Sequence, residues 1–128
     1  MIKLKAHSDR PASFLQYEFS DNSERIRRGR FSISTSKSNS TEEPILTAHL
    51  WDVLIDEEHR GRGYGKQLLK DAIRIAKQSG ASRMVLTVNN SNTIAQKLYE
   101  SEHFEYPHGK PTDDDASGFA LVRMERLL

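Results

Sequence analysis

The sequence predicts an α/β (α+β) fold with one mixed, mostly antiparallel sheet, and two observations lead to this class. Hydrophobic residues recur with a period of two in some segments and of 3.6 in others, as strands and amphipathic helices require. Both helical patterns lie in the second half of the chain, where they alternate with strand patterns. A strand, a helix and a further strand in succession predict a right-handed crossover between two parallel neighbours.

The first half of the chain predicts strands joined by turns. Alternating apolar and polar residues indicate strands at Ile2 to Ala6, Ser13 to Phe19, Phe31 to Thr35 and Ile45 to Ile55. Ser36 to Pro44 is a polar stretch rich in serine and asparagine, and we expect it to form the tip of a hairpin. Antiparallel pairing is therefore expected for the start of the sheet.

The second half predicts two helices and two strands. The first helix is expected from Gly63 to Ser79, because one stripe is apolar and Gly80 is a suitable residue just beyond the C-terminus. The strand at Arg83 to Val88 is nearly continuously apolar, which is typical of a central strand covered on both faces. The second helix is expected at Thr93 to Glu100 and the last strand at Phe119 to Glu125.

Length and composition limit the class of protein. With 128 residues, the chain is expected to form a single domain, residues 1–128, with a real core. It has no cysteine, which excludes a thiol nucleophile, a disulfide framework and a zinc site built on thiolates. No apolar run reaches signal-peptide length or the roughly twenty residues that span a bilayer, so we expect a cytoplasmic protein. We expect it to be a monomer or a homodimer. The net charge of +1 gives no global indication of nucleic-acid binding.

A glycine-rich loop, Arg60 to Gly65, lies between a predicted strand and the first helix. Its three glycines permit a positive φ and a close approach of the backbone to a ligand. The helix that follows presents unpaired N–H groups and the positive end of its dipole. Arg60, Arg62 and Lys66 add positive charge. The loop therefore predicts a site for a phosphate or pyrophosphate.

Spacing disfavours the two best-known phosphate loops. A P-loop needs four residues between its glycines, then Lys and Ser or Thr. Gly61 and Gly65 enclose three residues, and Lys66 is followed by Gln67, which has no hydroxyl for magnesium. A dinucleotide-binding loop needs an acid about twenty residues further on. The residues from Met84 to Val88 include none.

The remaining pattern, R-x-x-G-x-G after a strand, is carried by Arg60, Gly63 and Gly65. It resembles the phosphate loop of the GNAT superfamily of acetyl-CoA-dependent N-acetyltransferases. A second block, Asn92 to Glu100 followed by His103-Phe104, resembles the family's N-x-x-A-x-x-L-Y-E followed by Gly-Phe. His103 departs from the pattern, because the family usually has glycine there.

The resemblance implies acetyl-CoA as co-substrate and a central parallel pair of strands that splays apart to hold it. Few residues precede the central strand, so the family's N-terminal helices are expected to be reduced. The implied cofactor contacts are a short strand end, the glycine loop and one asparagine that is either a contact of the cofactor arm or a helix N-cap. These residues are Val53, Leu54, Ile55, Arg60, Gly61, Arg62, Gly63, Tyr64, Gly65, Lys66 and Asn92.

The implied reaction is direct attack of a primary amine on the thioester through a tetrahedral intermediate. A lysine-like amine is neutral in roughly one molecule in 2,500 at pH 7, equivalent to about 4.6 kcal/mol, so a proton acceptor is needed. The family's glutamate positions correspond here to Thr87, which cannot act as a base, and His49, which can. Asp52, Glu57 and Glu58 compete for this role.

Tyr99 stands at the position of the tyrosine that the family uses as general acid towards the leaving thiolate. The alternative is a helix tyrosine that packs against the sheet.

The acceptor depends on local charge. Asp113 to Asp115 could attract a cationic amine or form a solvated turn, and the acceptor stays open between small-molecule and protein amines. Two other functions remain: a catalytically degenerate acyl-CoA-binding or regulatory module and, more distantly, a nucleic-acid-binding protein that uses Arg25 to Arg30. No metal site is expected.

Overall fold

The computed structural model describes residues 2–5, 14–20, 27–38, 44–57, 60–109 and 121–128, and within them all eight predicted elements are present. The strands are β1 (Ile2–Lys5), β2 (Phe14–Ser20), β3 (Arg27–Lys37), β4 (Leu46–Ile55), β5 (Arg83–Asn89) and β6 (Leu121–Leu127). The helices are α1 (Tyr64–Gln78) and α2 (Thr93–Ser101).

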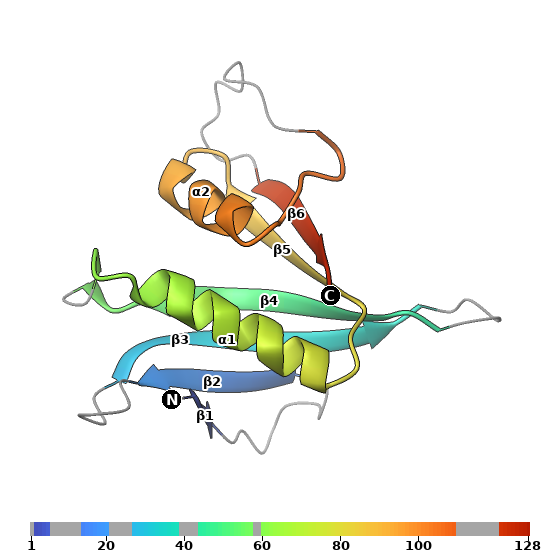
Figure 1. The fold of residues 1–128 in the computed structure, drawn as a ribbon, viewed down its shortest axis with the longest axis horizontal. Helices are drawn as coiled ribbons and strands as arrows, with labels where there is room; N and C mark the ends of the chain where they lie inside the picture. The colour runs from blue at the N-terminus through green and yellow to red at the C-terminus, as the bar shows by residue number, and fades with distance from the viewer. Residues whose placement is uncertain (1, 6–13, 21–26, 39–43, 58–59, 110–120) are drawn as a thin grey trace.

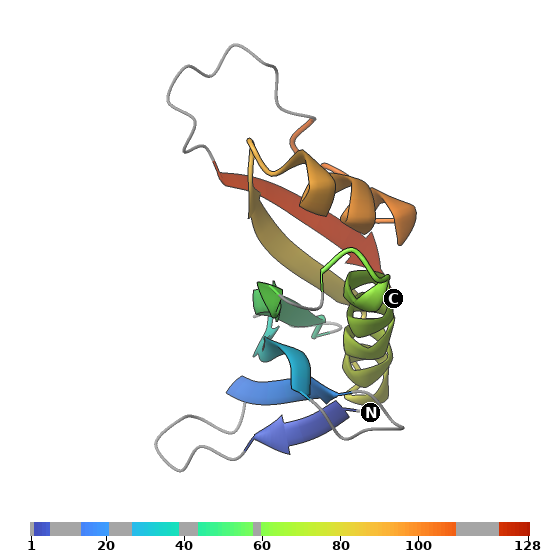
Figure 2. The same cartoon turned by 90° about the vertical axis from the view of Figure 1, so that its left-hand side faces the viewer.

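The strands form one six-stranded sheet in sequence order. Neighbouring strands are antiparallel except β4 and β5, which are parallel and joined through α1. Both helices lie on the same face of the sheet (Figures 1 and 2). Among the described residues no helix precedes α1, as the short N-terminal part predicted.

The parallel pair β4–β5 separates soon after it begins, which confirms the predicted splay. The strands are in register at Thr47 with Arg83, at Ala48 with Met84 and at His49 with Val85, and the pairing then ends. β5 stays paired with β6 as far as Asn89, and β4 stays paired with β3 as far as Ile55, so the sheet divides between β4 and β5. Figure 1 shows β5, β6 and α2 turning away from β1 to β4 and α1.

A β-bulge in β4 accompanies this separation. Arg30 of β3 faces Leu54 and Ser32 faces Trp51, so β4 contains one more residue than β3 in this interval. Asp52 lies in the bulge with a φ of 51°. A bulge bends its strand and increases the local twist, which directs the end of β4 away from β5.

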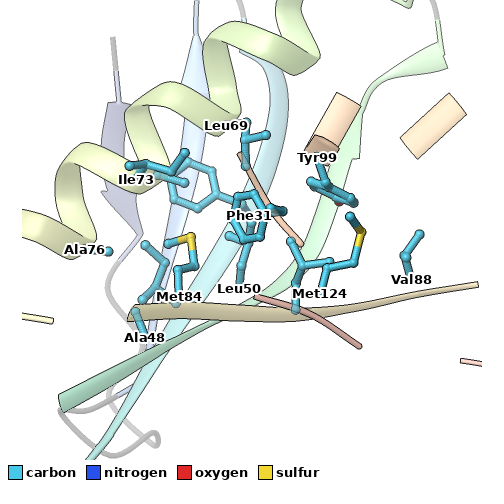
Figure 3. Close-up of a cluster of buried hydrophobic side chains, with 14 of the residues drawn as sticks. Phe31, Ala48, Leu50, Leu69, Ile73, Ala76, Met84, Val88, Tyr99 and Met124 are labelled. Atoms are coloured by element: carbon cyan, nitrogen blue, oxygen red, sulfur yellow. The ribbon is translucent and has the colours of Figure 1, made fainter. Parts of the chain in front are cut away.

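The core lies between the sheet and the two helices (Figure 3). α1 packs on β3 and β4, with Leu69 and Ile73 facing Phe31 and Leu50. Tyr99 of α2 extends the same cluster over β5 and β6. Because the apolar stripe of α1 is buried here, the start of α1 is fixed relative to the end of β4.

α1 ends as predicted. Ser79 is the C-cap residue of α1, and Gly80 follows with a φ of 87°. The N–H of Gly80 donates to the carbonyl of Lys77, and that of Ala81 donates to the carbonyl of Ala76. This pair of hydrogen bonds is a Schellman motif, in which a glycine takes the left-handed conformation at no steric cost.

β3 is longer than the predicted strand, which covered Phe31 to Thr35. It begins at Arg27, and the segment from Arg27 to Arg30 shows no apolar alternation because a charged residue occupies the buried position. Arg28 is 6% exposed, and its guanidinium lies 5.1 Å from the centre of the Tyr64 ring. A stacked arginine therefore replaces the apolar residue that sequence patterns detect.

Three features named from the sequence lie wholly or partly outside the described residues: the hairpin tip, the aspartate run and the arginine run. The hairpin tip is shorter than Ser36 to Pro44, because β3 continues to Lys37 and the N–H of Ser38 donates to the carbonyl of Ile45. Residues 39–43 of this tip are not described, nor are Asp113 to Asp115. Two residues of the arginine run, 25 and 26, are also outside the description.

Gly29→Ala should destabilise the protein. A Cβ at Gly29 would collide with the carbonyl oxygen of Leu54, at the bulged end of β4. We expect the free energy of unfolding to fall by about 1–3 kcal/mol, as for other overpacked sites, in urea denaturation. Arg30→Ala, at the next and exposed position, is the control and should change it by less than about 0.5 kcal/mol. Equal stability of the two variants would contradict the close approach of β3 and β4.

Candidate functional site

A cleft of about 850 Å³ opens where β4 and β5 separate. Its volume is within the range of about 300–1,000 Å³ that small-molecule sites occupy. The end of β4, the glycine loop, the end of β5 and the start of α2 form its walls. The lining residues are Leu50, Trp51, Asp52, Val53, Leu54, Ile55, Arg60, Gly61, Gly63, Tyr64, Gly65, Leu86, Thr87, Val88, Asn89, Asn92, Ile94, Ala95, Leu98 and Tyr99.

The glycine loop is shaped by backbone conformation. Gly61 and Gly63 have φ values of 78° and 81°. A Cβ at either residue would meet no described atom within 4 Å, so the space beside the loop is open, and the close approach of a ligand stays a prediction. The positive φ is the requirement that the structure itself shows, because it costs an L-residue about 1–2 kcal/mol.

The N-terminus of α1 has no side-chain cap from the described part of the chain. Gly63 is the N-cap residue, no side chain of the described residues bonds to the helix end, and the first turn contains no acidic residue. The first backbone hydrogen bond runs from the N–H of Gln67 to the carbonyl of Gly63, at 3.3 Å. The amides of Gly65 and Lys66 precede this bond, so the end of the helix can accept an anion.

Arg60 connects the loop to the end of β4. Its Nε donates to the carbonyl oxygen of Ile55 at 3.0 Å, and the residue lines the cleft. Arg62 and Lys66 are exposed and lie outside the residues that line the cleft. They can contribute long-range charge, but the structure does not place them at the wall where they were predicted.

Gly65 lies where α1 and α2 come close together. A Cβ there would lie 3.3 Å from Cδ2 of Leu98, so α1 and α2 approach each other across this position. Both residues line the cleft. A side chain at the third glycine of the loop would therefore press on Leu98 between the two helices.

Asn92 caps α2. Its side-chain oxygen accepts from the N–H of Ala95 at 3.1 Å, which confirms the predicted N-cap, and the residue also lines the cleft. Buried Gln96 donates through Nε2 to the carbonyls of Asn89 and Asn90, at 3.1 and 2.9 Å. The turn between β5 and α2 is therefore held by side chains on both sides.

Tyr99 is buried at the back of the cleft. It is 7% exposed, and its ring lies edge-on to Phe104 with 5.8 Å between the ring centres. Burial raises the pKa of the Tyr99 hydroxyl, which keeps the phenol protonated and able to donate. Packing against Phe104 and a place in the cleft wall occur together, so the two sequence interpretations are compatible.

His103 replaces a family glycine without changing the expected conformation. It follows α2 with a φ of 68°. The N–H of His103 donates to the carbonyl of Glu100 and that of Phe104 to the carbonyl of Tyr99. The backbone therefore takes the left-handed conformation that glycine favours, and Phe104 remains in the core.

His49 lies outside the large cleft, on the opposite face of the sheet. It lines a smaller hollow of about 80 Å³ that shares Leu50, Trp51, Leu86 and Thr87 with the cleft. Its Nε2 is 3.2 Å from the hydroxyl of Ser36, and its ring stacks on that of Trp51 with 6.0 Å between centres. The two residues share a strand face, as alternation predicted.

The environment of His49 favours its neutral form. Partial burial is the main cause that lowers the pKa of His49, and the positive charges of Arg123 and Arg83 lower it further. A neutral imidazole can accept a proton. The competing carboxylates are placed differently: Asp52 is exposed and lines the cleft, Glu57 is exposed and does not, and residue 58 is not described.

Several wall residues were not predicted from the sequence. They come from β4, the second half of β5 and α2, and they are Trp51, Leu86, Val88, Asn89, Ile94, Ala95 and Leu98. Their positions follow from the separation of β4 and β5, so pairing information would have been needed to find them.

The described chain contains neither a metal cluster nor a membrane-spanning helix. No group of three or more His, Cys, Asp and Glu residues there could hold a metal ion. None of the described helices has the length and hydropathy of a membrane-spanning segment.

Sequence comparison gives a family match. The profile described as "Acetyltransferase (GNAT) family" matches residues 7–104. A [ribosomal protein bS18]-alanine N-acetyltransferase from Haemophilus ducreyi is 42% identical over 57 residues, which are 44% of this chain and 39% of that protein. The chain matches less than half the length of this curated relative.

Two solved structures share the fold over nearly the whole chain. A GNAT family acetyltransferase from Elizabethkingia anophelis with acetyl-CoA bound has a TM-score of 0.71 and 18% identity, covering 100% of this chain and 97% of the other. An acetyltransferase from Bacillus subtilis in complex with CoA has a TM-score of 0.70 and 19% identity, covering 99% and 97%. The predicted α/β architecture is thereby confirmed.

Asn92→Ala should weaken α2. Loss of the side-chain cap is expected to lower the free energy of unfolding by about 1 kcal/mol in urea denaturation. Asn92→Asp is the matched control, because aspartate caps equally well and its charge suits a helix N-terminus. If both variants lose the same stability, the hydrogen bond from Ala95 is not what stabilises this end.

Proposed function

The chain belongs to the acetyltransferase (GNAT) family, and we propose that it transfers the acetyl group of acetyl-CoA to a primary amine. One observation carries the proposal. The strands β4 and β5 separate at a cleft that ends at the N-terminus of α1, which no side chain of the described residues caps, so one ligand can contact both a strand edge and an anion site.

Acetyl-CoA fits this cleft as co-substrate. Its pyrophosphate would lie at the start of α1, where Gly61 and Gly63 hold the loop open and the amides of Gly65 and Lys66 can donate. Arg60, at the same end, supplies a guanidinium. The CoA ligands of the two structural relatives support this assignment.

The pantetheine arm would run along the end of β4. Val53, Leu54 and Ile55 line the cleft and lie beyond the last residue pair that β4 forms with β5. A strand without a neighbour on one side offers N–H and C=O groups to an extended ligand. The bulge at Asp52 separates this stretch, which pairs only with β3, from the part of β4 that also pairs with β5.

We assign proton acceptance to His49, directly or through one water. The amine nitrogen forms a bond to the thioester carbon, the C–S bond breaks, and the proton of the nitrogen must leave. The low pKa of His49 keeps the imidazole neutral and ready to accept it. An amine entering from the small hollow would reach the gap between Leu50 and Leu86 beside His49, because these residues line both cavities.

Tyr99 is assigned to the leaving thiolate. Proton transfer from a phenol of ordinary pKa about 10 to a thiolate of about 8.5 costs roughly 2 kcal/mol, and burial of Tyr99 increases that cost. A hydrogen bond from the hydroxyl, which remains protonated, stabilises the thiolate without complete transfer. The CoA thiolate can then take up its proton from solvent as CoA leaves the cleft.

Two measurements test the function together. Isothermal titration should show binding of acetyl-CoA and CoA, and release of CoA thiol should depend on an added amine from a broad panel. Binding without release on any amine would instead favour the catalytically degenerate acyl-CoA-binding module. Absence of binding at millimolar CoA would contradict both.

The nucleic-acid alternative loses part of its basis. In the arginine run, Arg28 is buried against Tyr64, and Gly29 of β3 is buried against β4. Arg30 is exposed. The run is therefore not a continuous exposed basic stripe, which phosphate binding along a nucleic acid requires.

Tyr99→Phe should lower kcat by about 10- to 1000-fold with little change in the Kd of CoA, because the ring is kept and the donor is lost. Steady-state kinetics and titration measure the two quantities. Tyr17→Phe, in a ring stacked on Phe31 within the sheet, is the control and should leave kcat within about twofold. Unchanged kcat in Tyr99→Phe would remove Tyr99 from the reaction.

The pH dependence should reflect His49. Because its pKa is lowered from 6.5, kcat/KM should fall on the acid side at a pH below 6.5, where the imidazole becomes protonated and can no longer accept a proton. His49→Gln should lower kcat/KM by about 100-fold and abolish this acid limb. His108→Gln, at an exposed position, should retain it. Protonation of the acceptor amine itself lowers kcat/KM in every variant as the pH falls. A limb below pH 6.5 that is as steep in His49→Gln as in the wild type would therefore exclude His49 as the base.

A further inference from the structure

The small hollow beside the cleft has a positive wall. Its lining contains His49, Leu50, Trp51, Val85, Leu86, Thr87 and Arg123. Arg123 is the one arginine or lysine of this set, and the environment of His49 favours the neutral imidazole. No carboxylate lines the hollow within the described residues. Asp52 lines the large cleft instead.

Among the described residues, the ion pairs around the hollow leave one positive charge in excess. Glu125 lies 3.4 Å from Arg83 and 3.8 Å from Arg123, so one carboxylate serves two guanidiniums. Arg83 is held further by a hydrogen bond of 2.7 Å from its Nε to the hydroxyl of Thr47. Arg123 has the longer contact, and its side chain is 42% exposed. It is therefore the guanidinium with donors to offer to a ligand in the hollow.

Arg123 is also well positioned relative to the reaction site. It pairs across the strands with Thr87, which lines both the hollow and the cleft. The hollow measures about 80 Å³, roughly the volume of two to three water molecules. That space suits a carboxylate or a similar anionic head group, while the rest of an acceptor can lie against the exposed ring of Trp51.

We propose that the acceptor is a small primary amine that also carries an anionic group, a carboxylate or phosphonate, which Arg123 binds in this hollow. The proposal rests on the proposed transferase function and names the substrate class of the same site. The bidentate geometry of a guanidinium matches such a group. Its neutral amine nitrogen attacks the thioester carbon, the C–S bond breaks and His49 takes the nitrogen's proton. The CoA thiolate leaves hydrogen-bonded to the Tyr99 hydroxyl and takes its proton from solvent, to which His49 returns the one it accepted.

The test uses acceptors that differ only in the anionic group. The full chain is assayed with acetyl-CoA and three matched pairs: phenylalanine and its primary amide, alanine and its primary amide, and an aminoalkylphosphonate and its diethyl ester. Spermidine and an alanine-initiated peptide amide complete the panel. We expect the anionic member of at least one pair to have a kcat/KM about 10- to 100-fold above that of its neutral counterpart, the range of a hydrogen bond to a charged group.

Variants assign that preference to Arg123. Arg123→Gln should reduce the ratio of anionic to neutral acceptor by at least about tenfold, and Arg123→Lys should restore part of it. Arg74→Gln removes the same charge from an exposed position on α1 and should keep the wild-type ratio. Thermal melting of each variant checks that the fold is intact.

The outcomes separate the two proposals. Preference for the neutral amides, spermidine or the peptide would overturn the anionic acceptor and leave the transferase function standing. An unchanged ratio in Arg123→Gln would also overturn it, because the preference would then arise elsewhere. Binding of CoA with no transfer to any amine would overturn the transferase function, and the acceptor class with it.

Discussion

The structure depends on a parallel strand pair that stops pairing after three residue pairs, from Thr47 and Arg83 to His49 and Val85. A sheet that continued would bury its strand edges and leave no cleft. The bulge at Asp52 bends β4 away, and Gly29 lets β3 follow this bend without a clash. Unpaired strand edges are usually a liability, but here the edge is enclosed by two helices and can bind a ligand.

The gap has a different chemistry on each face of the sheet. On the helix side lie the N-terminus of α1, with its capacity for an anion, and the buried hydroxyl of Tyr99. On the other face lie His49 and Arg123, around a smaller hollow. In our proposal the co-substrate enters from the helix side and the acceptor from the other, so the two molecules meet between the strands without sharing an entrance.

Sequence patterns predicted most of the fold because its signals are local. The helix ends at Gly80 and Asn92 follow from capping rules, and the apolar run of β5 marks the centre of the sheet. The extension of β3 was missed because Arg28 is buried by stacking on Tyr64, which no hydrophobic pattern records. The place of His49 in the small hollow, and the set of residues that line the cleft, depend on where β4 separates from β5. That point is set by long-range strand pairing.

Amide hydrogen exchange with and without CoA tests the central claim most directly, since it locates the ligand without requiring turnover. CoA should slow exchange of amides at the end of β4, from Val53 to Ile55, and at the start of α1, at Gly65 and Lys66. The outer strands β1 and β2 should be unaffected. Protection confined to other segments, or none at saturating CoA, would contradict binding in the gap between β4 and β5.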